Sequence, residues 1–533
     1  MAPDTNETND TSSSPELQIS CGDDRSEIAE FYDRTNVLVT GGMGFVGKLL
    51  VEKLLRSCPG IAKLYMIVRP KKGKSAEERF KENFDEPVYD RLKLERPDFM
   101  DKIVMIESDI AEEDFNVAEE VNDMLKNTNV VFHVAATVRF DEKLRLAVNT
   151  NVRVTKRLLL WAKGLPNLKA FVYVSTAYSN CPNKVIDEIH YKATIDPDDF
   201  ISLANSLDND QLEAIKSALF SKFPNNYVIT KATAEAAVLK YGQDIPTGIV
   251  RPSIVLATSE EPLKAWVNNL YGSTGLAVGV GLGFVRTIYC IPEYVADLIP
   301  ADYVVATIIA AGWDIANRRS LTKLEENTNL PDEEKVPVYN SVTSPQNPVT
   351  WREYMELNRD YSVQIPSIKT IWYFILFFAR YVFIYRVNIF LLHTIPAIIV
   401  DTIARLIGRK PMLMDTYKKL HKYARAINYF SAKQWEFRNE NVRKMWGKLN
   451  SVDRKMFNFN VENIIWNDYF YHHVRGLRQY LVNDPLETVD AAIAKYNRLR
   501  IAHYTVVTLI TLLVAWLTLP IVSFVWSHFP WAY

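Results

Sequence analysis

A glycine-rich turn near the start of the chain constrains the fold more than any other feature. The stretch NVLVTGGMGFVGKLLVEKLLRS places Gly41, Gly44 and Gly47 where a β-branched run, 36–39, leads into an amphipathic helix expected over 44–57. Glycines let the backbone turn tightly and approach a pyrophosphate, and the helix N-terminus supplies free N–H groups and a partial positive charge. We therefore expect a dinucleotide to bind at this turn, in contact with Thr40, Gly41, Gly42, Gly44, Phe45, Val46 and Gly47.

The following 200 residues alternate between strand-like and helix-like segments. Apolar, β-branched runs predict strands over 63–70, 101–110, 129–137, 169–178 and 246–255. Segments with helical periodicity separate them, at 116–127, 143–163, 208–220 and 226–241. This alternation is typical of βαβ units, in which right-handed crossovers join parallel strands. The sequence thus predicts an α/β fold for residues 31–326, with a Rossmann-type doubly wound parallel sheet.

The residue at the end of the second strand indicates which dinucleotide is bound. Enzymes that use NAD usually carry Asp or Glu there, which holds the ribose 2′-hydroxyl. Here the strand ends in MIVRPKKGK, so Arg69 stands at the diagnostic position. A guanidinium suits a 2′-phosphate, whereas a carboxylate would repel it. The sequence therefore predicts NADPH, although the lysines after Arg69 also fit a solvated basic loop.

Further cofactor contacts are expected where the third and fourth strands end. Ligands of open α/β sheets bind at the carboxyl edge of the strands. Residues after the third strand are expected at the adenine, and small residues after the fourth let the cofactor lie across the edge. The expected contacts are Asp109 and Ile110 after the third strand, Ala135, Ala136 and Thr137 after the fourth, and Asn151 on the helix that follows.

A tyrosine and a lysine four residues apart form the candidate catalytic pair. Tyr227 and Lys231 share one helix face, follow the fifth strand with its hydroxyls Ser175 and Thr176, and precede another strand. A nearby ammonium is expected to lower the phenol pKa from ~10 and make proton transfer practical. The same spacing occurs at Tyr89, which precedes the third strand and follows no such hydroxyls. We therefore assign catalysis to the first pair alone.

Composition and charge exclude several other functions. The four cysteines lack CxxC spacing, so no metal site or disulfide framework is expected, and a reducing compartment is indicated. Residues 1–30 hold eight acids and one base and are expected to form a disordered acidic arm. This segment is not expected to be a signal peptide, because it has neither a basic start nor an apolar stretch. Residues 401–500 hold nineteen Lys or Arg against ten Asp or Glu. Because apolar stretches flank this region, an anionic membrane surface is a better partner than nucleic acid.

The C-terminal part of the chain is expected to contact a lipid bilayer. Residues 504–526 carry no charge and are long enough to cross ~30 Å of hydrocarbon as a helix. Arg498 and Arg500 lie on the N-terminal side, so the positive-inside rule predicts a tail-anchored protein with a cytosolic catalytic domain. The second apolar stretch, 371–400, contains Arg380 and Arg386, which favours an interfacial helix over a second span or a core helix.

Residues 327–350, with Pro and Asn, are expected to be a linker. Residues 351–500 are rich in aromatic residues and helical in pattern, which predicts a second, all-α domain that includes the membrane-associated segment 371–400.

These features together resemble the fatty acyl-CoA reductases, a membrane-bound branch of the extended short-chain dehydrogenase/reductases with a C-terminal sterile-type domain. The resemblance covers roughly residues 35–475 and rests on TGGMGFVG, VSTAY, YxxxK, RPSIV, IPADYVV and HTIPAIIVD. It implies NADPH-dependent reduction of a long-chain fatty acyl-CoA to a primary alcohol through an aldehyde. It also implies that Tyr227 is the proton donor, Lys231 its partner and ribose ligand, and Thr176 or Ser175 the second hydroxyl on the substrate oxygen. In RPSIV it adds the cofactor contacts Arg251, Pro252, Ser253 and Ile254.

Two other functions remain open at this stage. A membrane-bound sterol or steroid dehydrogenase of the same superfamily would share the glycine-rich turn and YxxxK, but would not explain the long C-terminal region or Arg69. A non-catalytic lipid-binding or scaffold protein would have no use for an intact set of Ser or Thr, Tyr and Lys. The sequence favours the endoplasmic reticulum, leaves peroxisomes and lipid droplets open, and allows a homo-oligomer.

Overall fold

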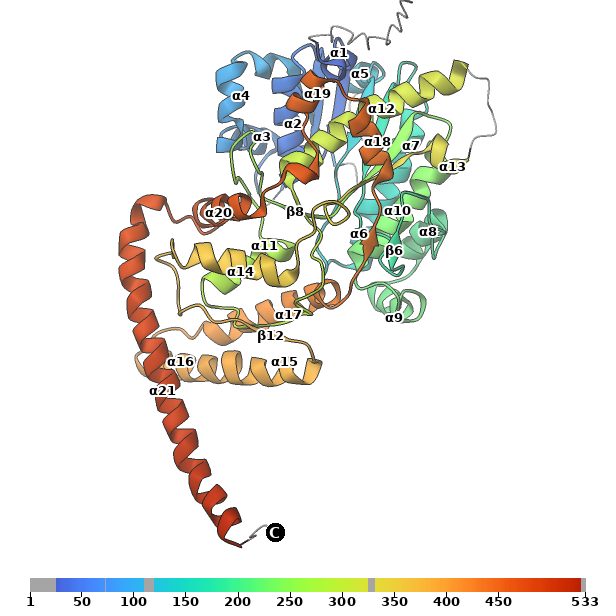
Figure 1. Ribbon diagram of the computed structural model, residues 1–533. Coiled ribbons are helices and arrows are strands. Elements are labelled where there is room, and N and C mark those ends of the chain that lie inside the picture. Colours follow the sequence, from blue (N-terminus) through green and yellow to red (C-terminus); the bar gives the residue numbers. More distant parts are fainter. Residues whose placement is uncertain (1–24, 72, 110–118, 325–330, 529–533) are drawn as a thin grey trace, which may run out of the picture.

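A seven-stranded parallel sheet forms the centre of the molecule (Figure 1). The computed structural model describes residues 25–71, 73–109, 119–324 and 331–528. The strand order is β11-β7-β5-β4-β1-β2-β3, and every neighbouring pair is parallel. The strands are β1 (Asn36–Thr40), β2 (Lys63–Val68), β3 (Ile103–Glu107), β4 (Val130–His133), β5 (Ala170–Val174), β7 (Thr247–Pro252) and β11 (Val338–Ser341). The predicted doubly wound fold is confirmed.

Helices cover both faces of the sheet, which explains the nearly unbroken apolar runs of its strands. Successive side chains of a strand point to opposite faces. Val37 and Val39 of β1 pack in the cluster that contains α2 (Phe45–Ser57) and α12 (Ala301–Leu324), whereas Leu38 packs in the cluster of α7 (Val154–Ala162) and α10 (Asn226–Gly242). Further α-helices of this part are α3 (Ala76–Phe84), α4 (Asp90–Glu95), α5 (Glu119–Leu125), α6 (Leu144–Val148), α8 (Pro197–Ser206), α9 (Asn209–Leu219), α11 (Gly272–Gly281) and α13 (Asp332–Lys335).

Strand β11 corrects the expectation of a linker over 327–350. Its four residues pair with β7 at the edge of the sheet, with Val338 opposite Ile249 and Ser341 opposite Pro252. All four are buried. The sequence signal was weak because the strand is short and follows a polar stretch, so its partner can be recognised only in three dimensions.

The C-terminal helical region shares the core of the sheet domain rather than forming a separate one. Trp351 of α14 (Trp351–Ser362), Met445 of α18 (Glu440–Lys448) and Phe470 of α20 (Trp466–Gly476) belong to the same hydrophobic cluster as β1 and α2. Two short strand pairs add further links, β12 (Phe377–Ala379) with β9 (Thr287–Tyr289) and β13 (Glu436–Phe437) with β6 (Val185–Ile186). Residues 351–500 are thus also not purely helical.

The end of the expected acidic arm is ordered. Helix α1 (Glu27–Phe31) begins at Ser26, whose hydroxyl donates to Asp453 of α19 (Ser451–Met456) at 2.5 Å. Ile28 and Tyr32 are fully buried. The prediction of disorder is therefore wrong for residues 27–30, and residues 1–24 lie outside the described part of the chain.

Two apolar helices lie at one end of the molecule. The first, 382–406, consists of α15 (Val382–Ile389), a π-helical turn, η4 (Phe390–Thr394), and α16 (Ile395–Leu406). One side is packed on α17 (Leu413–Ser431) and its neighbours and buries Tyr385, His393 and Ala397. The other side is apolar and exposed, at Val382, Phe383, Val387, Phe390, Leu391, Ile398, Ile399, Ile403 and Leu406.

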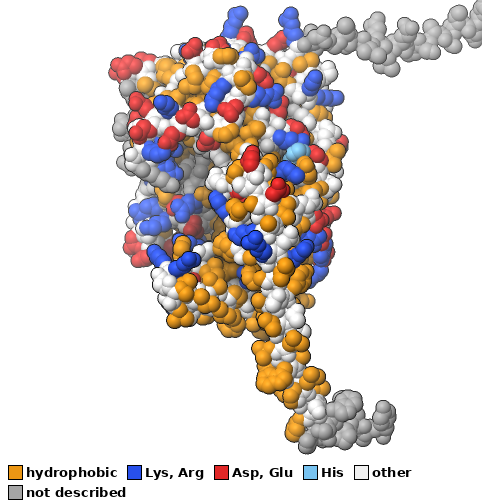
Figure 2. Space-filling view, turned by 90° about the vertical axis from the view of Figure 1, so that its left-hand side faces the viewer, with side chains coloured by type: hydrophobic (Ala, Val, Ile, Leu, Met, Phe, Trp, Pro, Cys, Tyr) orange, Lys and Arg blue, Asp and Glu red, His pale blue; other side chains and the backbone are white. Residues whose placement is uncertain are grey.

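The second helix, α21 (Val489–His528), runs past the same end and continues beyond the body (Figure 1). Its first part is attached, since Tyr496 is buried and His503 Nδ1 accepts from Trp372 Nε1 at 3.2 Å. Its large apolar side chains from Val506 to Phe524 are all exposed. Hydrophobic side chains gather at the lower end of the body and along α21 (Figure 2). Both helices are long and apolar enough to cross a membrane.

Candidate active site

The glycine-rich turn has the geometry that the sequence predicts for a dinucleotide. Gly41 has φ +78°, and a Cβ atom on it would lie 2.6 Å from the backbone N of Ala135. A Cβ on Gly47 would lie 2.1 Å from the carbonyl O of Gly41. No other residue fits either position, and α2 consequently starts with its free N–H groups directed at the carboxyl edge of the sheet.

A cavity of about 680 Å³ opens beside this turn. Its volume is within the usual range for small-molecule sites. Sixteen of the predicted site residues line it: Gly41, Gly44, Phe45, Val46, Gly47, Arg69, Asp109, Ala135, Ala136, Ser175, Thr176, Tyr227, Lys231, Pro252, Ser253 and Ile254.

Five predicted contacts with the cofactor lie outside the cavity wall, and Ile110 lies outside the described residues. Thr40 is fully buried and its hydroxyl lies 2.8 Å from Nδ1 of the core residue His133. Gly42 faces the core, where a Cβ would lie 2.9 Å from Cε of Met66. The other three are Thr137, Asn151 and Arg251. These five residues lie next to the cavity but do not line it.

Asn151 connects the loop after β4 to helix α10. It lies in a π-helical turn, η3 (Asn149–Arg153), a distortion that is frequent at functional sites. Its Oδ1 accepts from Thr137 N at 2.9 Å, and its Nδ2 donates to the Thr230 hydroxyl at 3.0 Å. Asn151 therefore positions Thr137 and the helix that carries the catalytic pair.

Basic side chains surround the end of the cavity near β2. Arg69 Nη1 contacts Asp109 Oδ2 at 3.1 Å, so two predicted cofactor residues form an ion pair. Lys71 and Arg79 also line this end, and the Arg79 guanidinium donates to the carbonyl O of Arg69. Burial and the neighbouring Arg69 lower the pKa of Arg79. Sequence reasoning missed Arg79 because it lies on α3, ten residues beyond the diagnostic position.

Three serine hydroxyls of the cavity wall are buried and have no hydrogen-bond partner among the described residues. They belong to Ser108, Ser253 and Ser273. Buried polar groups are normally paired, so unpaired hydroxyls on a cavity wall indicate a polar ligand. Ser108 lies beside Asp109, where the adenosine of a dinucleotide is expected, and Ser253 follows β7. The donor set thus fits a nicotinamide dinucleotide.

Tyr227 and Thr176 lie together in the wall of the cavity. Helix α10 begins with Asn225 as its N-cap, whose side chain accepts from Val228 N at 3.0 Å, and this places Tyr227 in the first turn. Burial raises the pKa of the Tyr227 phenol, and interaction with the Thr176 side chain opposes this rise. The expected lowering of this pKa by Lys231 is therefore not observed.

Lys231 is directed at the end of β5. Its Nζ donates to the carbonyl O of Val174 at 2.7 Å and to the Tyr173 hydroxyl at 3.2 Å. Burial lowers the pKa of Lys231 to about 7, and the charge of Glu235 offsets part of this shift. Lys231 and Tyr227 share a helix face as predicted, but the ammonium is held by the strand rather than by the phenol.

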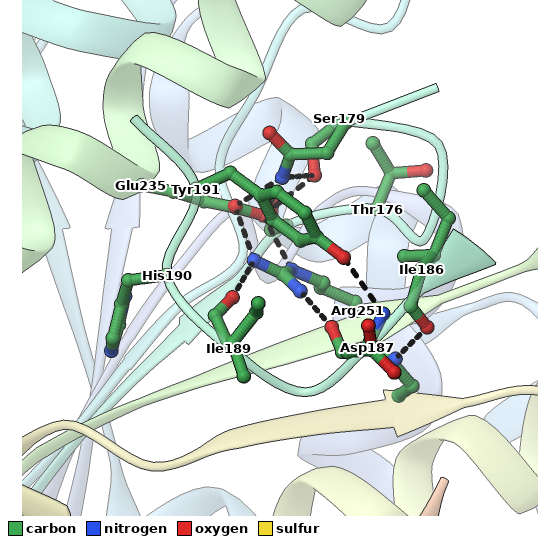
Figure 3. Close-up of polar contacts among 12 residues, drawn as sticks. Thr176, Ser179, Ile186, Asp187, Ile189, His190, Tyr191, Glu235 and Arg251 are labelled. Atoms are coloured by element: carbon green, nitrogen blue, oxygen red, sulfur yellow. Dashed lines mark hydrogen bonds and ion pairs between the residues drawn. The ribbon is translucent and has the colours of Figure 1, made fainter. Parts of the chain in front are cut away.

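The buried carboxylate of Glu235 separates the roles of the two hydroxyls after β5, and Figure 3 shows it beside Ser179 and Arg251. Glu235, one helical turn after Lys231, accepts from the Ser175 hydroxyl at 2.5 Å. It also accepts from Ser179 at 2.8 Å and Asn180 at 3.0 Å. The Ser175 hydroxyl is therefore engaged away from Tyr227, which leaves Thr176 as its companion.

Arg251 belongs to this same network. Its side chain is fully buried, and its Nη2 and Nε donate to Glu235 at 2.8 and 3.0 Å. Two further donor groups reach the carbonyl O atoms of Asp187 and Ile189, both at 3.0 Å. These partners occupy the guanidinium, so Arg251 supports the site as the partner of Glu235, instead of contacting the cofactor as predicted.

The second tyrosine with the same spacing has a structural role. Tyr89 is fully buried beside α4, and its hydroxyl accepts from Asn83 Nδ2 at 3.0 Å. Lys93 pairs with Asp90. Neither residue lines the cavity.

Comparison with known proteins identifies the family. Two family models described as male sterility protein match the chain, the NAD-binding one over residues 39–308 and the Sterile one over residues 392–484. The chain is 37% identical to "Fatty acyl-CoA reductase wat" of Drosophila melanogaster over 494 residues, which cover 92% of this chain and 93% of that protein. The chain belongs to the fatty acyl-CoA reductase family.

Other relatives agree with this assignment. Fatty acyl-CoA reductase 1 of Rattus norvegicus is 37% identical over 91% of the chain and 92% of its own length, and that of Homo sapiens is 36% identical over the same shares. Among solved structures, the terminal R domain of the myxalamid PKS-NRPS pathway has a TM-score of 0.51 at 18% identity, over 85% of this chain and 93% of that one. This last similarity concerns the fold. The family and the cavity together assign a nicotinamide cofactor.

Proposed function

We propose that this chain reduces a long-chain fatty acyl-CoA to a primary alcohol, with NADPH as the reductant and an aldehyde as the intermediate. The observation that carries the proposal is the shared cavity, in which Tyr227 and Thr176 face the same space as the glycine-rich turn. The names of the relatives support the substrate class, and membrane helices suit a substrate with a long apolar tail.

When bound along the turn, the cofactor supplies hydride to the substrate carbonyl. The residues of the chain then act on the oxygen of that carbonyl. Tyr227 and Thr176 donate hydrogen bonds to the oxyanion as charge develops on it, and such preorganised donors are usually the largest catalytic contribution. The first reduction yields the aldehyde when the oxyanion re-forms the carbonyl, the C–S bond breaks and CoA leaves as the thiol. The second reduction, which needs a further NADPH, leaves an alkoxide to which Tyr227 gives its proton. The raised pKa of Tyr227 keeps the phenol protonated for this purpose.

Lys231 and Glu235 are assigned supporting roles. Lys231 lines the cavity next to β5 and would hold the ribose hydroxyls of a bound cofactor. Loss of the Lys231 proton would weaken its attraction for these hydroxyls. The negative charge of Glu235 raises the pKa of Lys231 and so favours the charged form. The Ser175–Glu235–Arg251 network holds the end of β5 against α10 and so maintains the distance between Thr176 and Tyr227.

Arg69 is proposed to bind the 2′-phosphate of NADPH, and replacing Arg69 by Glu tests this together with the activity. Wild-type protein in detergent, given palmitoyl-CoA, is expected to release CoA thiol and fatty alcohol with NADPH and much less with NADH. The Arg69→Glu variant is expected to raise the KM for NADPH about tenfold to hundredfold, the value of one charge-assisted hydrogen bond. Product release is measured by thiol titration and gas chromatography.

A matched control is Arg359→Glu, since Arg359 is as exposed as Arg69, pairs with a neighbouring aspartate and lies outside the cavity. Its KM for NADPH should equal that of the wild type. Absence of both products at several chain lengths would refute the proposed activity and favour the sterol dehydrogenase or the non-catalytic alternative. An unchanged KM in Arg69→Glu would refute only the role of Arg69.

We also propose that 504–526 crosses the bilayer, while helix 382–406 lies in its cytosolic surface. The exposed apolar side of helix 382–406 supports this, because its other side is packed on the body and cannot face lipid. Arg380 supports it as well, since it pairs with Glu293 of the body at 2.5 Å.

Protease added to sealed microsomes is expected to digest residues 401–500 and to spare only a tag placed after residue 533. Recovery of a protected fragment that contains residues 401–500 would show that helix 382–406 also crosses the bilayer. Detergent-solubilised microsomes, in which the tag is digested too, provide the control.

A further inference from the structure

The cavity extends beyond Tyr227, away from the glycine-rich turn, into an aromatic and apolar arm. We define this acyl arm by the cavity residues Phe140, Tyr271, Trp351, Ile427 and Phe430. The Phe140 ring centroid lies 5.9 Å from that of Tyr227 and 6.0 Å from that of Phe430, so a continuous aromatic wall leads from the reacting carbonyl to α17. The turn and the basic end near Arg69 occupy the other arm, which leaves this one for the substrate.

A second, smaller cavity lies behind the acyl arm. It is lined by apolar and aromatic side chains, including Leu276, Val285, Leu420 and Ala424, and holds about 20 Å³. This is room for about one water-sized group. Tyr385 and His393 close its far side, and both belong to helix 382–406.

Among the residues that the structure describes, only Trp351 and Ile427 line both cavities. Trp351 is 1% exposed and its indole belongs to the central core of the molecule, whereas Ile427 is 5% exposed and stands on α17. These two side chains thus form the partition between an arm that is open to Tyr227 and a space beneath the membrane-facing helix.

We infer that Trp351 and Ile427 form the end wall of the acyl-chain channel, and that Ile427 limits the length of the chain that the enzyme reduces. This inference rests on the proposed acyl-CoA reductase function. An acyl chain with its carbonyl at Tyr227 extends along the aromatic wall, and its methyl end meets Ile427. A longer chain must displace that side chain, and one methylene gained or lost in an apolar pocket changes kcat/KM by about 10- to 200-fold.

Replacing Ile427 by alanine opens the partition and joins the two cavities. We expect the chain-length optimum to move to longer acyl-CoAs by about two carbon atoms, with the kcat/KM ratio of the longer to the original best substrate rising about tenfold. Ile427→Val should shift the ratio in the same direction by less, and Ile427→Phe should shift it towards shorter chains. The measurement is kcat/KM for saturated acyl-CoAs of increasing length, each with the same cofactor concentration.

Ile464→Ala is the matched control, since Ile464 is 6% exposed and lines neither cavity. It should lose stability like Ile427→Ala but keep the wild-type ranking of chain lengths. Because a ratio between substrates does not depend on the amount of folded enzyme, partial unfolding does not affect the comparison, and Ile427→Val tests the inference if the alanine variant does not fold. An active wild type whose ranking is unchanged in Ile427→Val and Ile427→Ala would overturn the inference, whereas a wild type inactive on every acyl-CoA would overturn the proposed function instead.

Discussion

Replacing Tyr227 by phenylalanine is expected to lower kcat by about 10²–10⁴-fold, the usual contribution of a positioned proton donor. The variant keeps the ring, so its contact with Phe140 and the shape of the cavity remain. It loses the hydroxyl that stabilises the oxyanion and protonates the alkoxide, while Thr176 alone remains on the substrate oxygen. The KM for NADPH should stay near the wild-type value. Steady-state rates of CoA and alcohol release provide both numbers.

Tyr89→Phe is the matched control for this prediction. It removes a buried tyrosine hydroxyl from the other YxxxK sequence, with the loss of one hydrogen bond from Asn83. A cost of about 1 kcal/mol in stability and an unchanged kcat are expected. Undiminished turnover in Tyr227→Phe would show that the proton comes from another group, and a large loss in Tyr89→Phe would show that the cavity is not the catalytic site.

Replacing Arg251 by methionine is expected to reduce the free energy of unfolding by about 3–5 kcal/mol. The side chain of Arg251 is fully buried, and its removal leaves the carboxylate of Glu235 without a counter-charge inside the protein. Two carbonyl groups, of Asp187 and Ile189, lose their donors as well. The measurement is the thermal unfolding midpoint of the purified protein in detergent.

Arg438→Met provides the comparison, because Arg438 pairs with Asp187 in the same region but is 53% exposed. Exposed ion pairs contribute little, so its cost should stay below about 1 kcal/mol. Equal midpoints for the two variants would mean that the Glu235 network contributes nothing to stability. The double variant Arg251→Met with Glu235→Leu, which removes both buried charges, should recover part of the loss.

Those parts of the fold and site that depend on neighbouring residues were predictable from the sequence. The glycine-rich turn, the strands before and after it, and the shared face of Tyr227 and Lys231 each follow from local spacing. In a parallel sheet the carboxyl ends of all strands lie at the same edge, so the location of the site was also predictable. This is why Arg69, Thr176 and Ser253, far apart in the chain, were correctly expected at one place.

Interactions between distant segments were not predictable in the same way. Arg251 and Ser175 lie at strand ends that face the cofactor in many such folds, but here the polar groups of both are bound by Glu235. The role of Glu235 could not be recognised from the sequence, since an acidic residue one turn after a lysine on a helix is typical of an ordinary surface ion pair. The phenol pKa followed burial instead of the nearby ammonium, and burial is a property of the folded chain.

Under the proposed topology, helix α21 has a mechanical consequence for the orientation of the enzyme on the membrane. It passes without interruption from residues packed on the body, such as Tyr496, into the apolar stretch that ends near Phe524. No loop separates the two parts, so a tilt of the anchor is also a tilt of the body. Helix 382–406 at the same end gives a second point of contact, and two points restrict rolling as well as tilting. This arrangement would limit changes in the depth and orientation of the active site relative to the lipid headgroups.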